Sequence, residues 1–303
     1  MGPAEFSYLG HRFRRRDLQV RNARGLLLEC SWWQPFTQDG STQEPLPCVV
    51  CLHGNSSCRV EALQHLRMVL QRGITLFAFD FAGCGMSQGD YISLGYHEKD
   101  DAREVVEYLR GTGQVSTIAL WGRSMGAATA LLHGHRDPSI AGLVLDSPFA
   151  ELELVVRELI ASMPLRHKPR FLVNAAIRIV RHSVRKRTGM DILNLRPIQN
   201  VDTCFIPALF VAGKDDALID PHHTTDIHAA YAGDKNILII EGDHNSDRPR
   251  YLSDGVSIFF YERLCVPAGL SGELPPSENT SPQSASSPWP AIPRAGGESA
   301  EDE

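Results

Sequence analysis

Short apolar runs rich in β-branched residues alternate with helical patterns along most of this 303-residue chain. Because parallel strands need a long crossover connection, usually a helix, the alternation predicts βαβ units that build a mostly parallel sheet. The predicted strands are 26–33, 48–52, 75–80, 117–121, 142–146, 207–211 and 236–240. Helices are predicted at 61–72, 97–110 and 124–133, after the Asp220-Pro221 pair, and at 250–264. The chain is therefore expected to adopt an α/β fold.

Two stretches depart from this alternation. Residues 151–200 contain helical patterns but no convincing strand, which predicts a helical cap inserted between two strands of the sheet. Residues 266–303 are dominated by Pro, Ser, Gly and Glu, which bury too little apolar surface to offset the entropy of ordering a chain. We therefore expect one α/β domain over residues 15–264, with its cap at about 151–200, followed by a disordered tail at 266–303.

Charge and cysteine usage narrow the class of protein. The chain has 30 basic and 36 acidic residues, a net charge of −6, which argues against nucleic acid as a partner because phosphate binding needs a cationic surface. Seven cysteines are scattered, and several lie in apolar runs where a free thiol behaves as a small hydrophobe. The sequence contains no run of 18 apolar residues and no apolar signal-peptide core. These features predict a cytoplasmic protein.

The pentapeptide Gly122-Arg123-Ser124-Met125-Gly126 stands between a predicted strand and a predicted helix. A serine at the tip of such a sharp strand-to-helix turn is typical of a nucleophile elbow, in which small flanking residues let the strand and the helix approach each other. The pattern also arises by chance, and the alternative is that Ser124 is a turn residue between two glycines. The other residues of the site must decide between these interpretations.

A serine nucleophile needs a base and an orienting acid, and candidates for both follow Ser124 in the sequence. His244 comes just after the predicted strand 236–240, and an Asp215-Asp216 pair comes just after the strand 207–211. The carboxyl ends of parallel strands meet at one edge of a sheet, so these residues are expected at the same edge as Ser124.

The segment His53-Gly54-Asn55 ends the predicted strand 48–52, where this architecture places a loop whose backbone N–H stabilises an oxyanion. His53 is interpreted as a structural hydrogen-bonding residue, because His244 has the better position for a base. His222 and His223 fall in the first turn of a predicted helix and are interpreted as surface or capping residues rather than a metal pair. No metal and no organic cofactor are expected.

Several segments resemble the α/β-hydrolase superfamily, more closely its serine aminopeptidase-type hydrolases and an often uncharacterised eukaryotic branch of them. The resemblance spans about 15–264 and is carried by His53-Gly54-Asn55, by Asp80 with Gly83, Gly85 and Ser87, by 121–127, by 145–149, and by Gly242-Asp243-His244-Asn245 with Arg248 and Pro249. It departs at Ala82, where many relatives carry arginine, so nothing about substrate binding is carried over from that position.

The resemblance implies an α/β-hydrolase fold and a role for each site residue. Ser124 is the implied nucleophile, His244 the base and Asp216 the acid, with the main-chain N–H groups of Asn55 and Met125 as the oxyanion hole. In relatives the acid usually stands three residues after a glycine, and Gly213 places Asp216 there. Asp215 is therefore expected to face solvent.

The cap contains a basic helical segment. Between Met163 and Met190 there are eight Lys or Arg residues and no acid. Arg178, Arg181 and Arg185 lie on one face of the predicted helix, and another face carries an apolar stripe of Leu172, Ala175, Ala176, Ile179, Val180 and Val184. An amphipathic basic helix is typical of a contact with anionic lipid or acidic substrates, so weak association with anionic membranes is one expectation. The alternative is a solvated cap whose apolar stripe packs on the body.

Together these features predict a serine hydrolase that cleaves an acyl ester, thioester or amide of a small molecule or lipid through an acyl-enzyme. A carboxylesterase or lipase, a protein-acyl thioesterase at membranes and an aminopeptidase share this machinery, and the sequence leaves all three open. A non-catalytic binding protein with the same fold is the alternative from another class.

Overall fold

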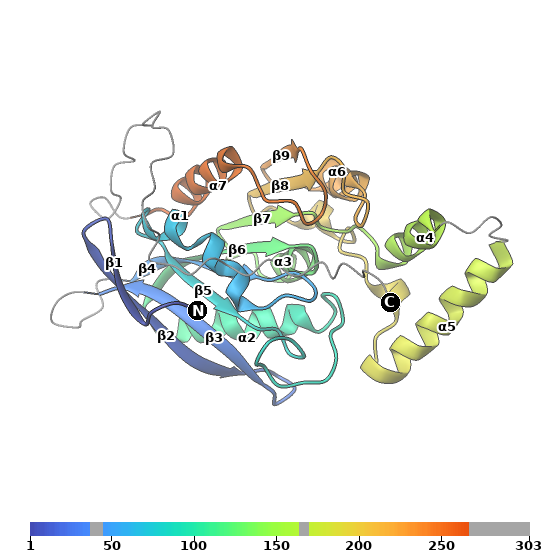
Figure 1. The fold of residues 1–303 in the computed structure, drawn as a ribbon, viewed down its shortest axis with the longest axis horizontal. Coiled ribbons are helices and arrows are strands. Elements are labelled where there is room, and N and C mark those ends of the chain that lie inside the picture. Colours follow the sequence, from blue (N-terminus) through green and yellow to red (C-terminus); the bar gives the residue numbers. More distant parts are fainter. Residues whose placement is uncertain (37–44, 164–169, 267–303) are drawn as a thin grey trace, which may run out of the picture.

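The computed structural model describes residues 1–36, 45–163 and 170–266, whose strands and helices surround one central sheet (Figure 1). The strands are β1 Glu5–Tyr8, β2 His11–Arg21, β3 Leu27–Pro35, β4 Leu46–Leu52, β5 Thr75–Phe79, β6 Val115–Arg123, β7 Gly142–Asp146, β8 Ala208–Gly213 and β9 Lys235–Ile240. The helices are α1 Leu66–Leu70, α2 Glu98–Gly111, α3 Met125–Gly134, α4 Leu152–Ser162, α5 Arg170–Thr188, α6 Pro221–Ala230 and α7 Arg250–Arg263, with 3-10 helices η1 Arg59–Gln64, η2 Ile192–Asn194 and η3 Val201–Thr203.

The described strands form one sheet in the order β1-β2-β3-β5-β4-β6-β7-β8-β9. From β5 to β9 every neighbouring pair is parallel, whereas β1, β2 and β3 pair antiparallel, and β3 lies antiparallel to β5. All seven predicted strands are present, as β3 to β9. The expectation of a mostly parallel sheet flanked by helices is confirmed.

The sheet begins earlier than the sequence indicated, because β1 and β2 were not predicted as strands. Five of the eleven residues of β2 are arginine, which hides its alternation, although Phe13 and Val20 are buried. The Arg16 guanidinium lies 5.8 Å from the ring of Trp32 on β3, so this charged side chain also covers an aromatic surface. The expected domain boundary at residue 15 therefore falls inside a strand.

Helices cover both faces of the sheet. On one face α2, α3 and α6 pack through residues such as Val105, Leu131 and Ile227, and on the other face α1 and α7 pack through Val69 and Phe260. This double cover explains why the residues of β5, β7 and β8 are all buried. The helix predicted at 61–72 is instead the 3-10 helix η1 followed by the short helix α1.

The cap is a helical excursion between β7 and β8, as predicted, and its described residues contain α4, α5 and η2 but no strand. Two backbone hydrogen bonds close its base. The N–H of Leu152 donates to the carbonyl of Leu195 at 3.0 Å, and the N–H of Ile198 donates to the carbonyl of Ala150 at 3.1 Å. A small apolar core, which includes Val155, packs the cap against the body.

The rotation of α5 differs from the expectation that its apolar stripe packs on the body. Ile177 is buried in the cap core, whereas Ile179 is 70% exposed and Val180 is 41% exposed. The reason is an anchor on another face, because Arg181 donates to Asp191 Oδ1 at 2.7 Å and turns that face inward. The side chain of Leu172 and the predicted tail beyond Val266 lie outside the described residues.

Among the helices that the structure describes, none combines the length and the apolar character needed to cross a membrane.

Candidate active site

Ser124 occupies the turn that joins β6 to α3, with φ 52° and ψ −115°. A positive φ is strained for a residue with a side chain, so the surroundings must hold it there. The N–H of Ser124 donates to the carbonyl of Asp146 at 2.7 Å. A Cβ on Gly122 would collide with the carbonyl of Gly126, and a Cβ on Gly126 would collide with that of Leu52. Both glycines are therefore required by the close approach of strand and helix.

His244 and Asp216 meet at the same edge of the sheet, on the loops that follow β9 and β8. Nδ1 of His244 lies 2.6 Å from Oδ2 of Asp216, and both side chains are buried. The other carboxylate oxygen, Oδ1, accepts the N–H groups of Leu218 at 3.0 Å and Ile219 at 2.8 Å. Asp215 is exposed. The geometry thus pairs Asp216, and not Asp215, with the imidazole.

The structure has no hydrogen bond between the described side chains of Ser124 and His244. Their loops are linked through Arg123 instead, whose guanidinium donates to the carbonyl of His244 at 2.5 Å. Hydrogen bonds between a nucleophile and its base are often long before substrate binds and tighten in the complex. The structure therefore brings Asp216 to His244, and brings the His244 loop to the residue that precedes Ser124.

The loop of one predicted oxyanion donor follows β4, and the other donor follows Ser124 directly after β6, which is a neighbour of β4 in the sheet. A Cβ on Gly54 would lie 4.0 Å from Cβ of Ser124, so the loop that includes Asn55 passes close to the serine. Met125 is the first residue of α3, where a backbone N–H has no partner within its own helix. Neither the Asn55 N–H nor the Met125 N–H donates a hydrogen bond within the described residues. Both donors are thus available to a ligand.

His53 holds the loop that follows β4 through both nitrogens of its ring. Its Nε2 accepts the N–H of Phe81 at 3.1 Å, so the proton of the neutral ring is on Nδ1, which donates to the carbonyl of Gly54 at 2.8 Å. Burial lowers the pKa of His53, which keeps the ring neutral. This arrangement agrees with the structural interpretation of His53.

Two further residues anchor the loops of the site and were given no role from the sequence. Oε2 of Glu61 accepts the N–H of Gly54 at 3.1 Å and so holds the oxyanion loop. Arg248 holds the His244 loop, because it donates to both carboxylate oxygens of Asp146, at 2.9 and 2.8 Å, and to the carbonyl of Asp243 at 3.1 Å. Arg248 was marked by the family resemblance, whereas nothing in the sequence distinguished Glu61 from other helix glutamates.

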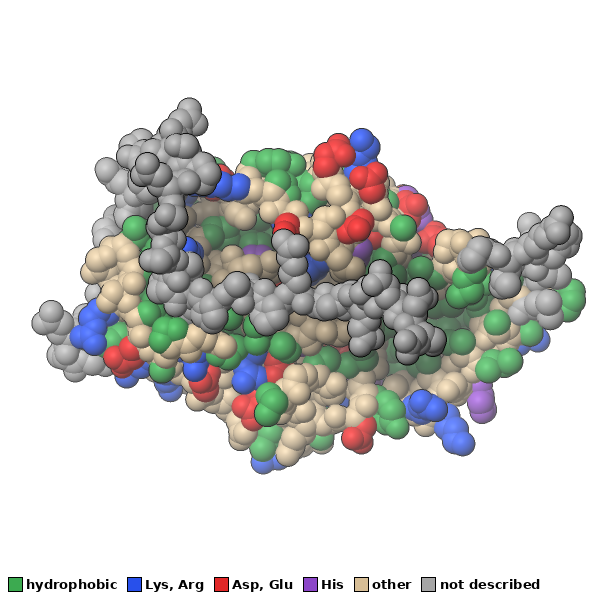
Figure 2. Space-filling view, viewed as in Figure 1, with side chains coloured by type: hydrophobic (Ala, Val, Ile, Leu, Met, Phe, Trp, Pro, Cys, Tyr) green, Lys and Arg blue, Asp and Glu red, His purple; other side chains and the backbone are tan. Residues whose placement is uncertain are grey.

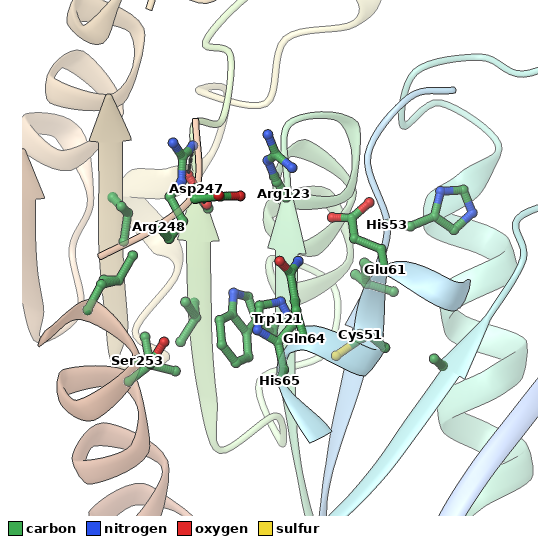
Figure 3. Close-up of a pocket in the computed structure, with 18 of the residues that line it drawn as sticks. Cys51, His53, Glu61, Gln64, His65, Trp121, Arg123, Asp247, Arg248 and Ser253 are labelled. Atoms are coloured by element: carbon green, nitrogen blue, oxygen red, sulfur yellow. Dashed lines mark hydrogen bonds and ion pairs between the residues drawn. The ribbon is translucent and has the colours of Figure 1, made fainter. Parts of the chain in front are cut away.

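These anchors line a cavity of about 70 Å³ (Figure 3). Figure 3 shows Arg123, Arg248 and Glu61 around one end of it, and Trp121 and His65 at the other. The ring of His65 stacks on that of Trp121 at 3.6 Å, and burial lowers the pKa of His65 to about 3. Ser124 does not belong to the described lining, and the volume is below that of an ordinary ligand pocket. This cavity lies between the residues that anchor the loops of the candidate site.

One cluster of metal-ligating side chains lies apart from this site. Nε2 of His222 and Nε2 of His223, at the start of α6, lie 2.8 and 2.9 Å from the two carboxylate oxygens of Glu158 on α4. However, the N–H of Ala150 donates to Nδ1 of His223 at 3.2 Å, so Nε2 carries the proton and donates to Glu158. A metal on Nε2 would force a proton onto Nδ1, against that N–H.

The cluster is therefore better explained as a set of hydrogen bonds that join the cap to the body than as a metal site. Asp220 caps α6 as predicted, with its side chain accepting the N–H of His222 at 3.0 Å. The expectation that both histidines are surface or capping residues is wrong for His223, which is fully buried. Its burial results from the contact with the cap residue Glu158, which the sequence does not reveal.

Comparisons with known proteins show which proteins this chain is similar to. A family model described as serine aminopeptidase, S33, matches residues 43–191. The uncharacterized protein YqkD of Bacillus subtilis is 29% identical over 206 residues, which cover 66% of this chain and 65% of that protein. Human monoglyceride lipase is 26% identical over 254 residues, which cover 74% of this chain and 81% of the lipase.

A solved structure gives the same fold. The Pyrococcus furiosus esterase Pf2001 superposes with a TM-score of 0.65 and 18% identity, over 83% of this chain and 92% of the esterase. At that identity the likeness shows the fold alone. Together with the sheet order, the sharp strand-to-helix turn at Ser124 and the matched family model, these findings show that the chain has the α/β-hydrolase fold and is similar to the serine aminopeptidase family over residues 43–191.

Proposed function

We propose that this protein is a serine hydrolase that cleaves a carboxylic ester through an acyl-enzyme formed on Ser124. The observation that carries the proposal is the buried His244–Asp216 pair at the sheet edge where the strained turn presents Ser124. A buried carboxylate hydrogen-bonded to Nδ1 fixes the tautomer whose Nε2 is free to accept a proton. The free N–H groups of Asn55 and Met125 supply the matching oxyanion donors.

The acylation step follows from these positions. Oγ of Ser124 attacks the acyl carbonyl while Nε2 of His244 takes its proton, and the carbonyl oxygen becomes an oxyanion held by the two main-chain N–H groups. Asp216 stabilises the imidazolium that forms. When the tetrahedral intermediate collapses, the bond to the leaving group breaks and the leaving alcohol takes the proton from His244. Ser124 is then acylated and His244 is neutral again.

Deacylation repeats these roles with water. His244 takes a proton from a water molecule as that water attacks the acyl-enzyme, and the same two N–H groups stabilise the second oxyanion. Collapse releases the carboxylic acid, and the proton on His244 returns to Oγ of Ser124. Every step uses side chains and main-chain groups of this chain.

An ester of a small molecule or lipid is the favoured substrate class, and similar proteins support that choice. The names of two similar proteins identify one as a monoglyceride lipase and the other as an esterase. A thioester or an amide requires the same triad, so a protein-acyl thioesterase and an aminopeptidase are the competing activities. The non-catalytic alternative is disfavoured by the buried His244–Asp216 pair, which orients an imidazole at the sheet edge where Ser124 stands.

The proposal includes a cytoplasmic location, which the cysteines support. All seven are free thiols, and four of them are buried in the apolar interior. Burial raises the pKa of Cys48 to about 12, so this side chain remains a neutral thiol. Buried, unpaired thiols are typical of proteins from reducing compartments.

Labelling by a fluorophosphonate, which reacts only with an activated serine, tests the proposal directly. The wild-type protein is expected to be labelled and Ser124→Ala is not. Ser147→Ala is the matched control, because Ser147 is buried and also has φ 52°, and it should be labelled like the wild type. If the Ser124→Ala variant were labelled, Ser124 would not be the nucleophile. If the wild-type protein were not labelled, a non-catalytic binding protein would be favoured.

Turnover then distinguishes the activities. A panel of acyl esters, acyl thioesters and aminoacyl amides with matched acyl groups should show the highest kcat/KM for the esters. A preference for thioesters or for aminoacyl amides would reverse the choice of substrate class while keeping the nucleophile.

A further inference from the structure

The outward surface of α5 carries large apolar side chains that nothing in the described chain covers. We define this outer face as the exposed residues Phe171, Arg178, Ile179, His182 and Lys186. Phe171 and Ile179 are each 70% exposed, although side chains of this size are usually buried. They lie on the side of the helix opposite to Ile177 and Val184, which pack in the cap. The outer face therefore exposes two large apolar side chains among polar and basic ones.

Cations surround these apolar side chains. Arg178, Arg185, Lys186 and Arg187 are exposed and have no ion-pair partner within the described residues, whereas Arg181 is paired with Asp191. The sequence has no acid from residue 164 to residue 190. Figure 2 shows hydrophobic and basic side chains side by side along α5, at the right of the molecule. All the charged side chains of α5 are therefore positive.

The outer face adjoins the edge of the sheet that holds the candidate site. Tyr91, on the loop that follows β5, lines one groove together with Arg178, Ile179 and Lys186 of α5. The end of α5 is tied to the same region, because Nε2 of His97 lies 2.9 Å from the carbonyl of Thr188. A surface that covers α5 would therefore also lie beside the loop at the carboxyl end of β5.

Charge complementarity selects the occupant. Two copies of this face, related by a twofold axis, would bring like charges together, which opposes a symmetric dimer. A bilayer with anionic lipids offers phosphates to the cations and an apolar layer to Phe171 and Ile179. Helices that lie in a membrane interface have this combination of basic and large apolar residues.

We propose that α5 is a docking surface for anionic lipid bilayers, with Phe171 and Ile179 inserted at the boundary between headgroups and acyl chains. The exposed cations bind lipid phosphates around them. This proposal goes beyond the ester hydrolysis proposed above and does not depend on Ser124. It places the groove beside Tyr91 against the membrane.

Co-sedimentation of the full chain with vesicles tests the proposal. Vesicles of phosphatidylcholine with a quarter phosphatidylglycerol should bind the protein at low salt, and pure phosphatidylcholine should bind it at least tenfold more weakly. Each cation near an anionic surface contributes about fivefold in affinity, so Arg178→Gln with Arg185→Gln and Lys186→Gln should lose at least tenfold. Phe171→Ser with Ile179→Ser should lose a similar amount at any salt concentration.

A matched control removes the same charge elsewhere. Arg21, Arg67 and Arg250 are exposed and lie away from α5, so changing all three to Gln should alter binding by less than about twofold. Ser124→Ala should bind vesicles like the wild type, which separates this proposal from the hydrolase proposal. Equal losses in the α5 and control variants would overturn it by revealing a net-charge effect. Absent vesicle binding, or a dimer that Ile179→Ser dissociates, would also overturn it.

Discussion

Nδ1 of His244 lies 2.6 Å from Oδ2 of Asp216, and the two side chains are only 9% and 1% exposed. In this geometry one carboxylate oxygen is dedicated to the imidazole, while the other is held by main-chain N–H groups. The pair is thus oriented before any substrate arrives. Because only Asp216 contacts the imidazole, mutating Asp216 and Asp215 separately tests which of the two orients His244.

Asp216→Asn should lower kcat for an ester by about 10⁴, by analogy with the same change in serine proteases. The amide retains the shape but can present a donor to Nδ1, which favours the wrong imidazole tautomer. Asp215→Asn is the matched control, since Asp215 is exposed and one residue away, and should remain within about threefold of the wild type. A large loss at Asp215 with Asp216→Asn nearly unchanged would reverse the assignment.

Glu61→Ala should lower kcat by about tenfold or more, because the Gly54 N–H loses its acceptor and the oxyanion loop loses an anchor. Glu61→Gln retains an acceptor oxygen and should keep most of the activity. Binding of a phosphonate transition-state analogue should weaken in parallel with kcat, while KM for the ester changes little. Equal losses for the alanine and glutamine variants would show that Glu61 acts through its charge instead.

Asp146→Ala should lower the free energy of unfolding by about 3 kcal/mol, since it leaves the largely buried Arg248 guanidinium without its carboxylate. Urea unfolding measures this change. Lys214→Ala breaks the exposed pair with Glu241 and should cost less than about 0.5 kcal/mol. Similar costs for the two variants would mean that the Asp146–Arg248 pair contributes no more than a surface pair.

His65 should make the fold less stable as pH falls below about 6.5. Its pKa is lowered to about 3 in the folded protein, so between these values the unfolded chain binds a proton that the folded chain does not. The effect reaches about 1.4 kcal/mol per pH unit for one histidine. His65→Phe keeps the stack on Trp121 without titrating, and should reduce the slope in urea unfolding measured at pH 7, 6 and 5.

Part of that slope should remain in His65→Phe, because burial also lowers the pKa of His133, to about 4. An unchanged slope in the variant would exclude His65 as a source of acid sensitivity.

The elements of the fold that could be predicted are those buried on both sides. The strands β5, β7 and β8 are apolar throughout because helices cover both faces of a parallel sheet, so their sequence alone distinguishes them. Ser124, His244 and Asp216 could be placed at one edge since each follows a predicted strand of the parallel part of the sheet, namely β6, β9 and β8. In contrast β2, at the antiparallel side of the sheet, is hidden by its arginines.

The contacts that could not be predicted join different loops and elements of the fold. Nothing local indicates that Glu61 reaches back to Gly54, or that Arg248 reaches Asp146 across 102 positions. The rotation of α5 is set by the pairing of Arg181 with Asp191, and helical periodicity does not reveal which of two apolar faces is buried. These features depend on tertiary packing, which overrides the local pattern.

The two backbone hydrogen bonds at the base of the cap, between Leu152 and Leu195 and between Ala150 and Ile198, make the intervening segment a closed loop on a fixed stem. Because the stem is formed by main-chain atoms, it does not depend on the side chains of the excursion. The segment 153–194 can therefore be replaced as a whole by the corresponding segment of a related protein. A chimera joined at this stem would acquire a new cap on an unaltered sheet, with the loops that carry Ser124, Asp216 and His244 unchanged.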